Sequence, residues 1–511
     1  MKQILKLALR NLKEHKSKTI IISLFILFGV AIVIMGNSFL ESVNRGLEKD
    51  FRANVTGDIA ISIKPEKGTM IDVFGVSSTN ITGDIPQIGA LPDLERVEQI
   101  LDETTGIKKR SKMISAQVLL AKGAEIDLSA FTENDDLGIM DLPISMMFAC
   151  ENKTFWELFQ DLKMIEGRYP AAGTNEIIVD TRVLAGFKKT YGQEIQLGDT
   201  VLLLGANTNG IIREGVVVGF FKPANEYSAM FQSLYCNPEL ARSFADLTYA
   251  SSFKQELPDS VDLSLSSLSE DDLFGSFDDD DLFGGIDEDA SILGSTEDFD
   301  SILGDTTLRD ELNKTDDGSW HFILAKLDNP SADKKMVAAL QKRFDEEGLN
   351  VQVMDWKKAA MSYSGTVEGI GFIFNLLIII LAVVVFIIIM NTMTVSVIER
   401  TSEIGTMRAI GAEKKFVKRL FYSEAVMLTS VSSLVGIIFA FICMAVFNSF
   451  NIAITNEIAK MILGGGLLHF SPTLKIILMT VIIAIAGSVI SNMYPVKSAL
   501  KITPLKALSK E

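Results

Sequence analysis

The sequence predicts an α-helical membrane protein with four transmembrane helices and a large α+β periplasmic domain inserted between the first two of them. Three observations support this prediction: long apolar segments, basic residues beside only some of them, and a middle region with strand and helix patterns. The apolar segments are 19–40, 370–393, 425–447 and 474–493, and their only charged residue is Lys475. Each has about 20 residues or more, enough to cross a hydrocarbon layer of about 30 Å.

The first apolar segment leaves two interpretations to weigh. A cleaved signal peptide would have an apolar run of about 7–15 residues and a small-x-small cleavage site. The run 19–40 is longer and NSFLESV offers no such site, so we expect a retained helix. We expect residues 1–18 to form a cytoplasmic amphipathic helix on the membrane surface, because Ile4, Leu5 and Ala8 share one face. An ordinary basic flank would carry the same charge.

Basic residues beside the spans predict the orientation of the chain. They are Lys2, Lys6, Arg10, Lys13, Lys16 and Lys18 before the first span, Arg400, Arg408, Lys414, Lys415, Lys418 and Arg419 in the loop 394–424, and Lys497, Lys501, Lys506 and Lys510 in the tail 494–511. The short loop 448–473 has only Lys460. We therefore predict that both termini and the loop 394–424 are cytoplasmic, whereas 41–369 and 448–473 are periplasmic.

The region 41–369 has the patterns of a folded α+β domain. FWELFQDLKMIEGRYP is predicted to be a helix followed by a turn, and TVLLL and EGVVVGF alternate as strands do. Further on, a strand at His321–Leu327, a helix opened near Ser331 and closed at Gly348, and a strand at Val351–Met354 predict a βαβ-like unit. The whole chain has a net charge of −17, and the flanks 1–40 and 370–511 carry +5 and +6, so the region 41–369 carries −28, which argues against nucleic-acid binding.

Two features of the outer region stay open. Residues 266–305 are acidic and repeat DDLFG and SILG, which favours a disordered acidic insertion over about 255–310. A docking motif with Leu-Phe anchors is the alternative, and the Asp spacing does not match an EF-hand loop. Cys150 and Cys236 could form a disulfide in an oxidising compartment, but their spacing does not establish one.

The loop 394–424 is a short polar and basic segment between two spans. Ser402 can cap a short helix, EIGTMRAI, which Gly411 would end in the left-handed conformation. Ile404, Met407 and Ile410 recur every third residue and predict a small apolar ridge on this helix. From the residues alone, two roles of this loop are equally well supported: it could be anchored at anionic lipid, or it could dock on a protein.

The stretch NTMTVSVIERTSEIGTMRAIGAEKKFVKRLFYSEAVMLTSVSSLVGIIFA resembles the signature region of the FtsX-like permeases of ABC transporters, which include the MacB exporter and the lipoprotein-release permeases LolC and LolE. The matching positions are Asn391, Glu399 to Thr401, Glu403 to Gly405, Arg408, Ala409, Gly411, Ala412, Glu424 and Ala425. The ending YPVKSALKITPLKAL is similar to the family's C-terminus. The segment from EGRYPAAG to EGVVVGFFKP is similar to a MacB-like periplasmic core.

The resemblance implies that the loop carries a coupling helix, roughly Glu399–Gly411, which sits in a groove of an ATPase subunit. The ATPase-coupling residues that it implies are Glu399, Arg400, Glu403, Ile404, Met407, Arg408 and Gly411. Among these, Glu403 and Arg408 are expected to make polar contacts with the ATPase, and Ile404 and Met407 to be buried against it.

The chain shows no sign of a catalytic site of its own. It has no G-x-x-x-x-G-K-[ST] loop, so ATP would be hydrolysed by a separate subunit, and no directly bound cofactor is expected. His15, His321 and His469 are too scattered for a metal centre or a catalytic triad. We therefore expect a non-catalytic membrane subunit.

The resemblance implies a permease subunit in the bacterial inner membrane that works by mechanotransmission, which is the relay of ATP-driven motion to the periplasmic side. The function that we expect is the release of lipoproteins from the membrane. The alternatives are MacB-like export of peptides or drugs with a periplasmic adaptor, FtsX-like regulation of periplasmic enzymes, and a passive anchor for the acidic segment. The expected partners are an ATPase, a second permease subunit that is identical or a paralogue, and a periplasmic carrier or adaptor.

Overall fold

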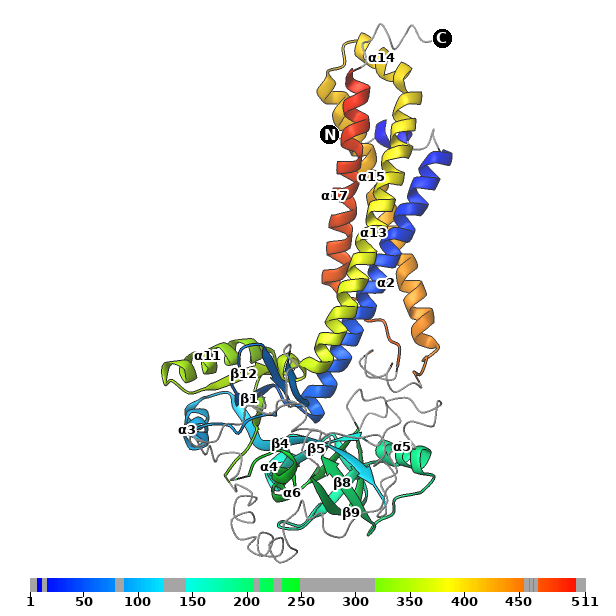
Figure 1. Ribbon diagram of the computed structural model, residues 1–511. Coiled ribbons are helices and arrows are strands. Elements are labelled where there is room, and N and C mark those ends of the chain that lie inside the picture. The colour runs from blue at the N-terminus through cyan, green and yellow to red at the C-terminus, as the bar shows by residue number, and fades with distance from the viewer. Residues whose placement is uncertain are drawn as a thin grey trace, which may run out of the picture.

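The computed structural model describes residues 7–11, 16–78, 87–122, 144–205, 211–223, 232–248, 318–454, 459, 463 and 467–501. The structure consists of a bundle of long helices and an α+β domain. Helices α2 and α13 extend side by side from the bundle into the domain (Figure 1). The predicted acidic insertion at about 255–310 lies outside the described residues, as do the last ten residues of the predicted tail.

The bundle consists of α2 (Lys16–Asn54), α13 (Met361–Glu399), α15 (Lys414–Ser449) and α17 (Leu474–Lys501). All four are long and apolar enough to cross a membrane. Their outward side chains are also apolar, which suits helices surrounded by lipid. This bundle, together with the α+β domain, confirms the predicted fold class.

Two of these helices are much longer than the apolar segments from which they were predicted. Helix α2 has 39 residues, or about 58 Å at ~1.5 Å per residue, so it extends well beyond a hydrocarbon layer of ~30 Å. Beyond the bundle, Leu47 and Phe51 of α2 are fully buried, and the Phe51 ring lies 5.2 Å from that of Tyr363 on α13. The two helices form a stalk whose end belongs to the core of the α+β domain.

The domain is built on a ten-stranded sheet in the order β12-β1-β11-β4-β5-β10-β7-β9-β6, with β8 pairing β4 and β9. The strands are β1 (Ile59–Ile63), β4 (Ile107–Ala121), β5 (Ile144–Cys150), β6 (Leu162–Gly167), β7 (Glu176–Asp180), β8 (Thr200–Gly205), β9 (Ile212–Pro223), β10 (Ser233–Cys236), β11 (Phe322–Leu327) and β12 (Val351–Asp355), and β2 (Thr69–Asp72) and β3 (Gly75–Ser78) form a separate hairpin. The helices are α3 (Leu94–Glu103), α4 (Asn152–Leu158), α5 (Thr181–Tyr191), α6 (Pro238–Phe244), the 3-10 turn η4 (Pro330–Ala332), α11 (Asp333–Glu346) and α12 (Trp356–Ala359).

The unit predicted near the end of the domain forms, but another strand divides it. Strands β11 and β12 flank α11, which ends before Gly348 at a φ of 72°, as the sequence suggested. The two strands do not pair with each other. Strand β1 lies between them and is antiparallel to both. Since β1 directly follows α2 and β12 directly precedes α13 through α12, both stalk helices join the same edge of the sheet.

One other expectation is wrong, and one open question is answered. The helix predicted from FWELFQDLKMIEGRYP ends at Leu158, and its second half is the edge strand β6, which pairs with β9. These residues form a strand despite their local helix propensity, because they can pair with the long strand β9. Cys150 and Cys236 are both free thiols, and they belong to apolar clusters on different sides of the sheet, so they are not paired.

His321, just before β11, makes the stability of the domain depend on pH. Its Nδ1 accepts a hydrogen bond from Ser115 N at 3.3 Å, and complete burial lowers the pKa of the imidazole from 6.5 to about 4. Between about pH 4 and pH 6.5 the imidazole of His321 therefore binds a proton in the unfolded chain but not in the folded chain. Stability should be fully present above pH 6.5 and fall by about 3 kcal/mol as the pH drops to about 4.

The measurement is a denaturant titration of the full chain at several pH values between 4 and 7.5, followed by tryptophan fluorescence. We expect His321→Gln to remove this part of the pH dependence. The control is His469→Gln, because His469 is exposed. An unchanged slope in His321→Gln would contradict the prediction.

Candidate functional site

The segment Arg400–Glu413 between α13 and α15, called the elbow here, contains one short helix and one tight turn. Helix α14 spans Thr401–Ala409, and Gly411 turns the chain at a φ of 105°, a left-handed value that suits glycine. The turn is closed by Gly411 N donating to Arg408 O at 3.2 Å and by Ala412 N donating to Met407 O at 3.0 Å. Ser402 lies inside the helix and is not its cap.

The inner face of α14 packs against the ends of two spans. Ile404 is 3% exposed and lies in an apolar cluster with Val417 and Phe421 of α15 and Val496 of α17. Met407 and Leu500 pack against the same cluster. The elbow is therefore part of the bundle, and Ile404 is buried against this chain's own spans.

The predicted apolar ridge is not a single surface. Ile404 points inward, Met407 is half-buried, and Ile410 is 83% exposed. The reason is geometric: six residues along an α-helix turn the side-chain direction by about 120° from the starting point. Of the three, Ile410 alone lies fully on the outside of the elbow.

A buried ion pair fixes the start of α14 to the start of the third span. Arg400 Nη1 lies 2.9 Å from Glu424 Oε2 on α15, and the two side chains are 6% and 7% exposed. The guanidinium also lies 5.3 Å from the centre of the Phe421 ring, and its Nε donates to Glu403 at 3.1 Å. Burial alone would lower the pKa of Arg400, but Glu424 and Glu403 hold it above its usual value, so the guanidinium stays charged.

The N-terminal segment reaches the same ion pair. Asn11, in the helical turn 7–11, donates its amide Nδ2 hydrogen to Glu424 Oε1 at 2.6 Å. Glu424 therefore has partners on both of its oxygens, as a buried carboxylate needs. Through this residue the N-terminal segment, α14 and α15 are held together.

The remaining residues predicted for the site lie outside this buried core. Glu399 and Glu403 are exposed, Gly411 is exposed at the turn, and Arg408 is half-buried with Nη1 3.5 Å from Leu500 O. The exposed side chains of α14 and its end form one outer face, made of Ser402, Glu403, Thr406, Ala409 and Ile410. Sequence reasoning missed Asn11, Glu424 and Val496 as parts of the site. An acid at the edge of an apolar run was the available signal for Glu424.

At the other end of the stalk, Arg52 joins α2 to the α+β domain. Its Nη1 lies 2.8 Å from Asp58 Oδ1, and its Nη2 pairs with Asp333 at the start of α11. Asp58 Oδ2 in turn accepts the amide of Leu327 in β11 at 2.8 Å. Figure 1 shows α2 meeting the β1 and α11 part of the domain at this point. Arg52 thus links the end of α2 directly to the sheet and to α11.

Part of the bundle is similar to known permeases. Residues 375–504 match the family model described as FtsX-like permease C-terminal. The ABC transporter permease YtrF of Bacillus subtilis is 33% identical over 147 residues, which is 28% of this chain and 32% of YtrF. The macrolide export protein MacB of Mannheimia succiniciproducens is 32% identical over 123 residues, covering 24% of this chain and 17% of MacB. The chain thus spans about a third or less of these curated relatives.

Solved structures resemble this chain only loosely. The periplasmic region of MacB from Actinobacillus actinomycetemcomitans is 12% identical with a TM-score of 0.26, over 62% of this chain and 94% of that one. The extracellular domain of YknZ from Gram-positive bacteria is 10% identical with a TM-score of 0.26, over 58% and 99%. The match at residues 375–504 is the specific one, and it covers α14, α15, α17 and most of α13. This chain therefore carries an FtsX-like permease domain.

Proposed function

We propose that this chain is the permease subunit of an ABC transporter in the bacterial inner membrane. In this proposal the elbow and both termini lie in the cytoplasm, and the α+β domain lies in the periplasm. Basic residues gather at the elbow end of the bundle and support this orientation. The ATPase would be a separate subunit that binds the outer face of α14. ATP enters the cycle through that subunit alone.

The observation that carries the proposal is the rigid attachment of the elbow. Ile404 and the Arg400–Glu424 pair fix α14 to α15, and the cluster around Val496 fixes it to α17. A force on α14 therefore acts on the spans and does not merely bend a loop. Helices α2 and α13 then continue without a break into the domain, where Arg52 joins the sheet. This is a mechanical path from an ATPase to the periplasmic side.

The contact with the ATPase is assigned to the exposed residues of α14. Ile410, with a large apolar side chain almost fully in solvent, is the residue whose burial would contribute most, about 1.5–3 kcal/mol. Glu403 and Arg408 at the edge of this face supply polar contacts. Ile404 supports the face from within, which modifies the role implied by family resemblance.

For the cargo, we propose release of lipoproteins from the membrane. The stalk and the α+β domain fit work done on a cargo at the outer surface, and the resemblance to a family that includes LolC and LolE supports a lipidated cargo. Export with a periplasmic adaptor is the second candidate, because the relatives include proteins named for macrolide and pyoverdine export. A second permease subunit, identical or a paralogue, would complete the transporter in either case.

The test is co-purification of the full-length chain with its ATPase from membranes. Ile410→Asp places a charge in the proposed contact and should lower the amount of bound ATPase at least tenfold. The matched control is Ile165→Asp, because Ile165 is also exposed but lies on edge strand β6. If Ile410→Asp retains the ATPase as well as Ile165→Asp does, the proposed contact is wrong.

A further inference from the structure

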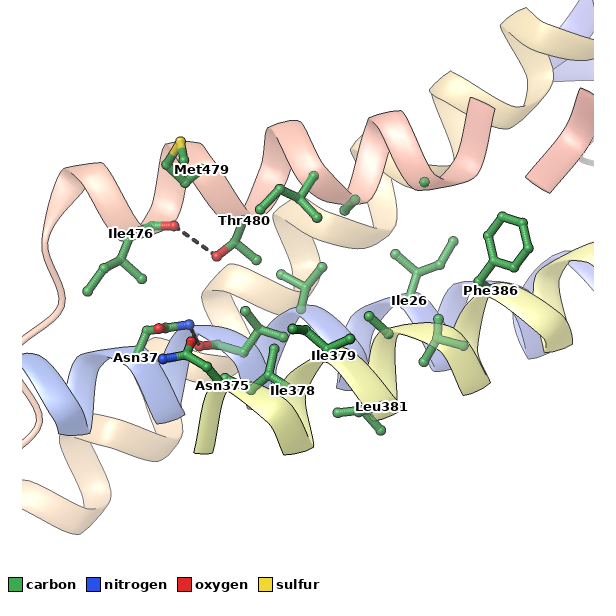
Figure 2. A pocket seen from close by; sticks show the side chains of 18 of the residues that line it. Ile26, Asn37, Asn375, Ile378, Ile379, Leu381, Phe386, Ile476, Met479 and Thr480 are labelled. Carbon is green, nitrogen blue, oxygen red and sulfur yellow. Dashed lines mark hydrogen bonds between the residues drawn. The ribbon is translucent and has the colours of Figure 1, made fainter. Parts of the chain in front are cut away.

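The bundle contains a large apolar groove that coupling does not explain. Helices α2, α13 and α17 line a cavity of about 980 Å³. This volume is at the upper end of the ~300–1,000 Å³ usual for ligand sites. Figure 2 shows α17 on one side of the groove and α2 with α13 on the other. Most of the lining is aliphatic, with Ile26, Ile379 and Ile483 among the residues along its length.

The groove has one polar end and one apolar end. Asn37 and Asn375 lie together at the end nearer the stalk, whereas Ile26 and Phe386 lie at the opposite end (Figure 2). The polar end also includes Glu41, Arg45, Thr473 and Lys475. The side-chain amides of Asn37 and Asn375 donate to carbonyls of their own helices, at 2.9 Å and 2.8 Å.

At the polar end, Lys475 is the cationic side chain that a ligand could bind. Arg45 is paired with Glu41 at 3.1 Å. Lys475 is exposed, and within the described parts of the chain it has no carboxylate at ion-pair distance. An anion at this end of the groove would therefore meet Lys475 first. A phosphate group has the charge and the size to do so.

The apolar part of the groove on α2 fits one leaflet of a bilayer. From Ile26 to Asn37 the helix rises about 16 Å, half of a hydrocarbon layer of ~30 Å is about 15 Å, and the lining then continues along α2 to the charged side chains of Glu41 and Arg45. A transmembrane helix from a second copy would cross both leaflets and would have to pass the charged groups at the polar end. A lipid with one polar head and apolar chains of single-leaflet length matches the groove without that cost.

We propose that this groove binds a diacyl phospholipid from the leaflet next to the α+β domain. Its acyl chains lie along α2, α13 and α17, and its phosphate lies at Lys475. Because α17 also supplies Val496 and Leu500 to the cluster under the elbow, the lipid sits between a helix that packs against the elbow and the two stalk helices. The proposal rests on the membrane topology proposed above, but it does not depend on an ATPase.

The experiment uses the full-length chain in nanodiscs that contain a diacyl phosphatidylethanolamine with a photoreactive group on one acyl chain. We expect labelling to concentrate on residues that line the groove. Gly487→Phe should lower that labelling at least fivefold, because a Cβ at Gly487 meets no atom within 4 Å and the new ring would fill the groove. The control is Ile482→Phe, on the same helix but outside the lining; it should label as the natural chain does.

A second pair of variants tests the headgroup contact separately. Lys475→Glu should lower labelling of the groove at least threefold, whereas Lys475→Arg should retain it, and an unchanged thermal midpoint confirms folding. Labelling spread evenly around the bundle, or Gly487→Phe labelled as strongly as Ile482→Phe, would overturn the proposal. Loss of ATPase binding in Ile410→Asp would leave these results unchanged, so the two proposals can fail independently.

Discussion

Replacing Glu424 with alanine should destabilise the bundle by about 3–5 kcal/mol, because Arg400 would remain buried with its main counter-charge removed. Asn11 would also lose its acceptor, so the N-terminal segment should detach from the elbow. The measurement is the thermal or denaturant midpoint of the full chain in detergent or nanodiscs. Proteolysis of the N-terminal segment should accelerate in parallel.

Two matched variants show whether burial is the cause. Glu403 also pairs with Arg400, but it is 54% exposed, so Glu403→Ala should cost under about 1 kcal/mol. The double variant Arg400→Met with Glu424→Leu removes both charges and should recover most of the stability lost in Glu424→Ala. Equal destabilisation by Glu403→Ala and Glu424→Ala would show that the buried pair does not hold the elbow.

Replacing Arg52 with alanine is the second change with a large expected effect. Asp58 and Asp333 are only 5% and 9% exposed and would lose the cation between them, at a cost of about 3–5 kcal/mol. In a reconstituted transporter we also expect ATP hydrolysis to continue while work on the cargo is lost. The reason is that the joint between α2 and the sheet would be loosened far from the ATPase contact.

The control for this change lies on the same helix. Arg45 makes an exposed pair with Glu41 one turn away, so Arg45→Ala should cost no more than about 0.5 kcal/mol. Stability is read from the denaturation midpoint of the full chain, and coupling from the ratio of cargo released to ATP hydrolysed. A normal ratio in a folded Arg52→Ala variant would remove Arg52 from the force path.

The sequence was informative where local rules decide the structure. Runs of apolar residues predicted the four membrane helices, and Gly411 predicted the end of α14, because a left-handed turn there favours glycine. The stalk could be anticipated from the helical pattern that continues past the apolar segments. None of these features needs information about distant parts of the chain.

The rest depends on residues that are far apart in the sequence. Whether Ile404 faces inward is decided by Val496, which comes from the end of the last span. The position of β1 between β11 and β12 depends on a strand that precedes them by more than 250 residues. Glu424 was visible as an acid beside an apolar run, but its burial follows from Arg400 and Asn11 closing over it.

The central claim is that an ATPase holds the outer face of α14. The most direct measurement is photo-cross-linking in native membranes from a reactive amino acid placed at Ile410, compared with the same probe at Val431, an exposed position on the third span. We expect the probe at position 410 to form an adduct with the ATPase subunit, whereas the probe at position 431 should form none. Cross-linking at position 410 to phospholipid alone would contradict the account.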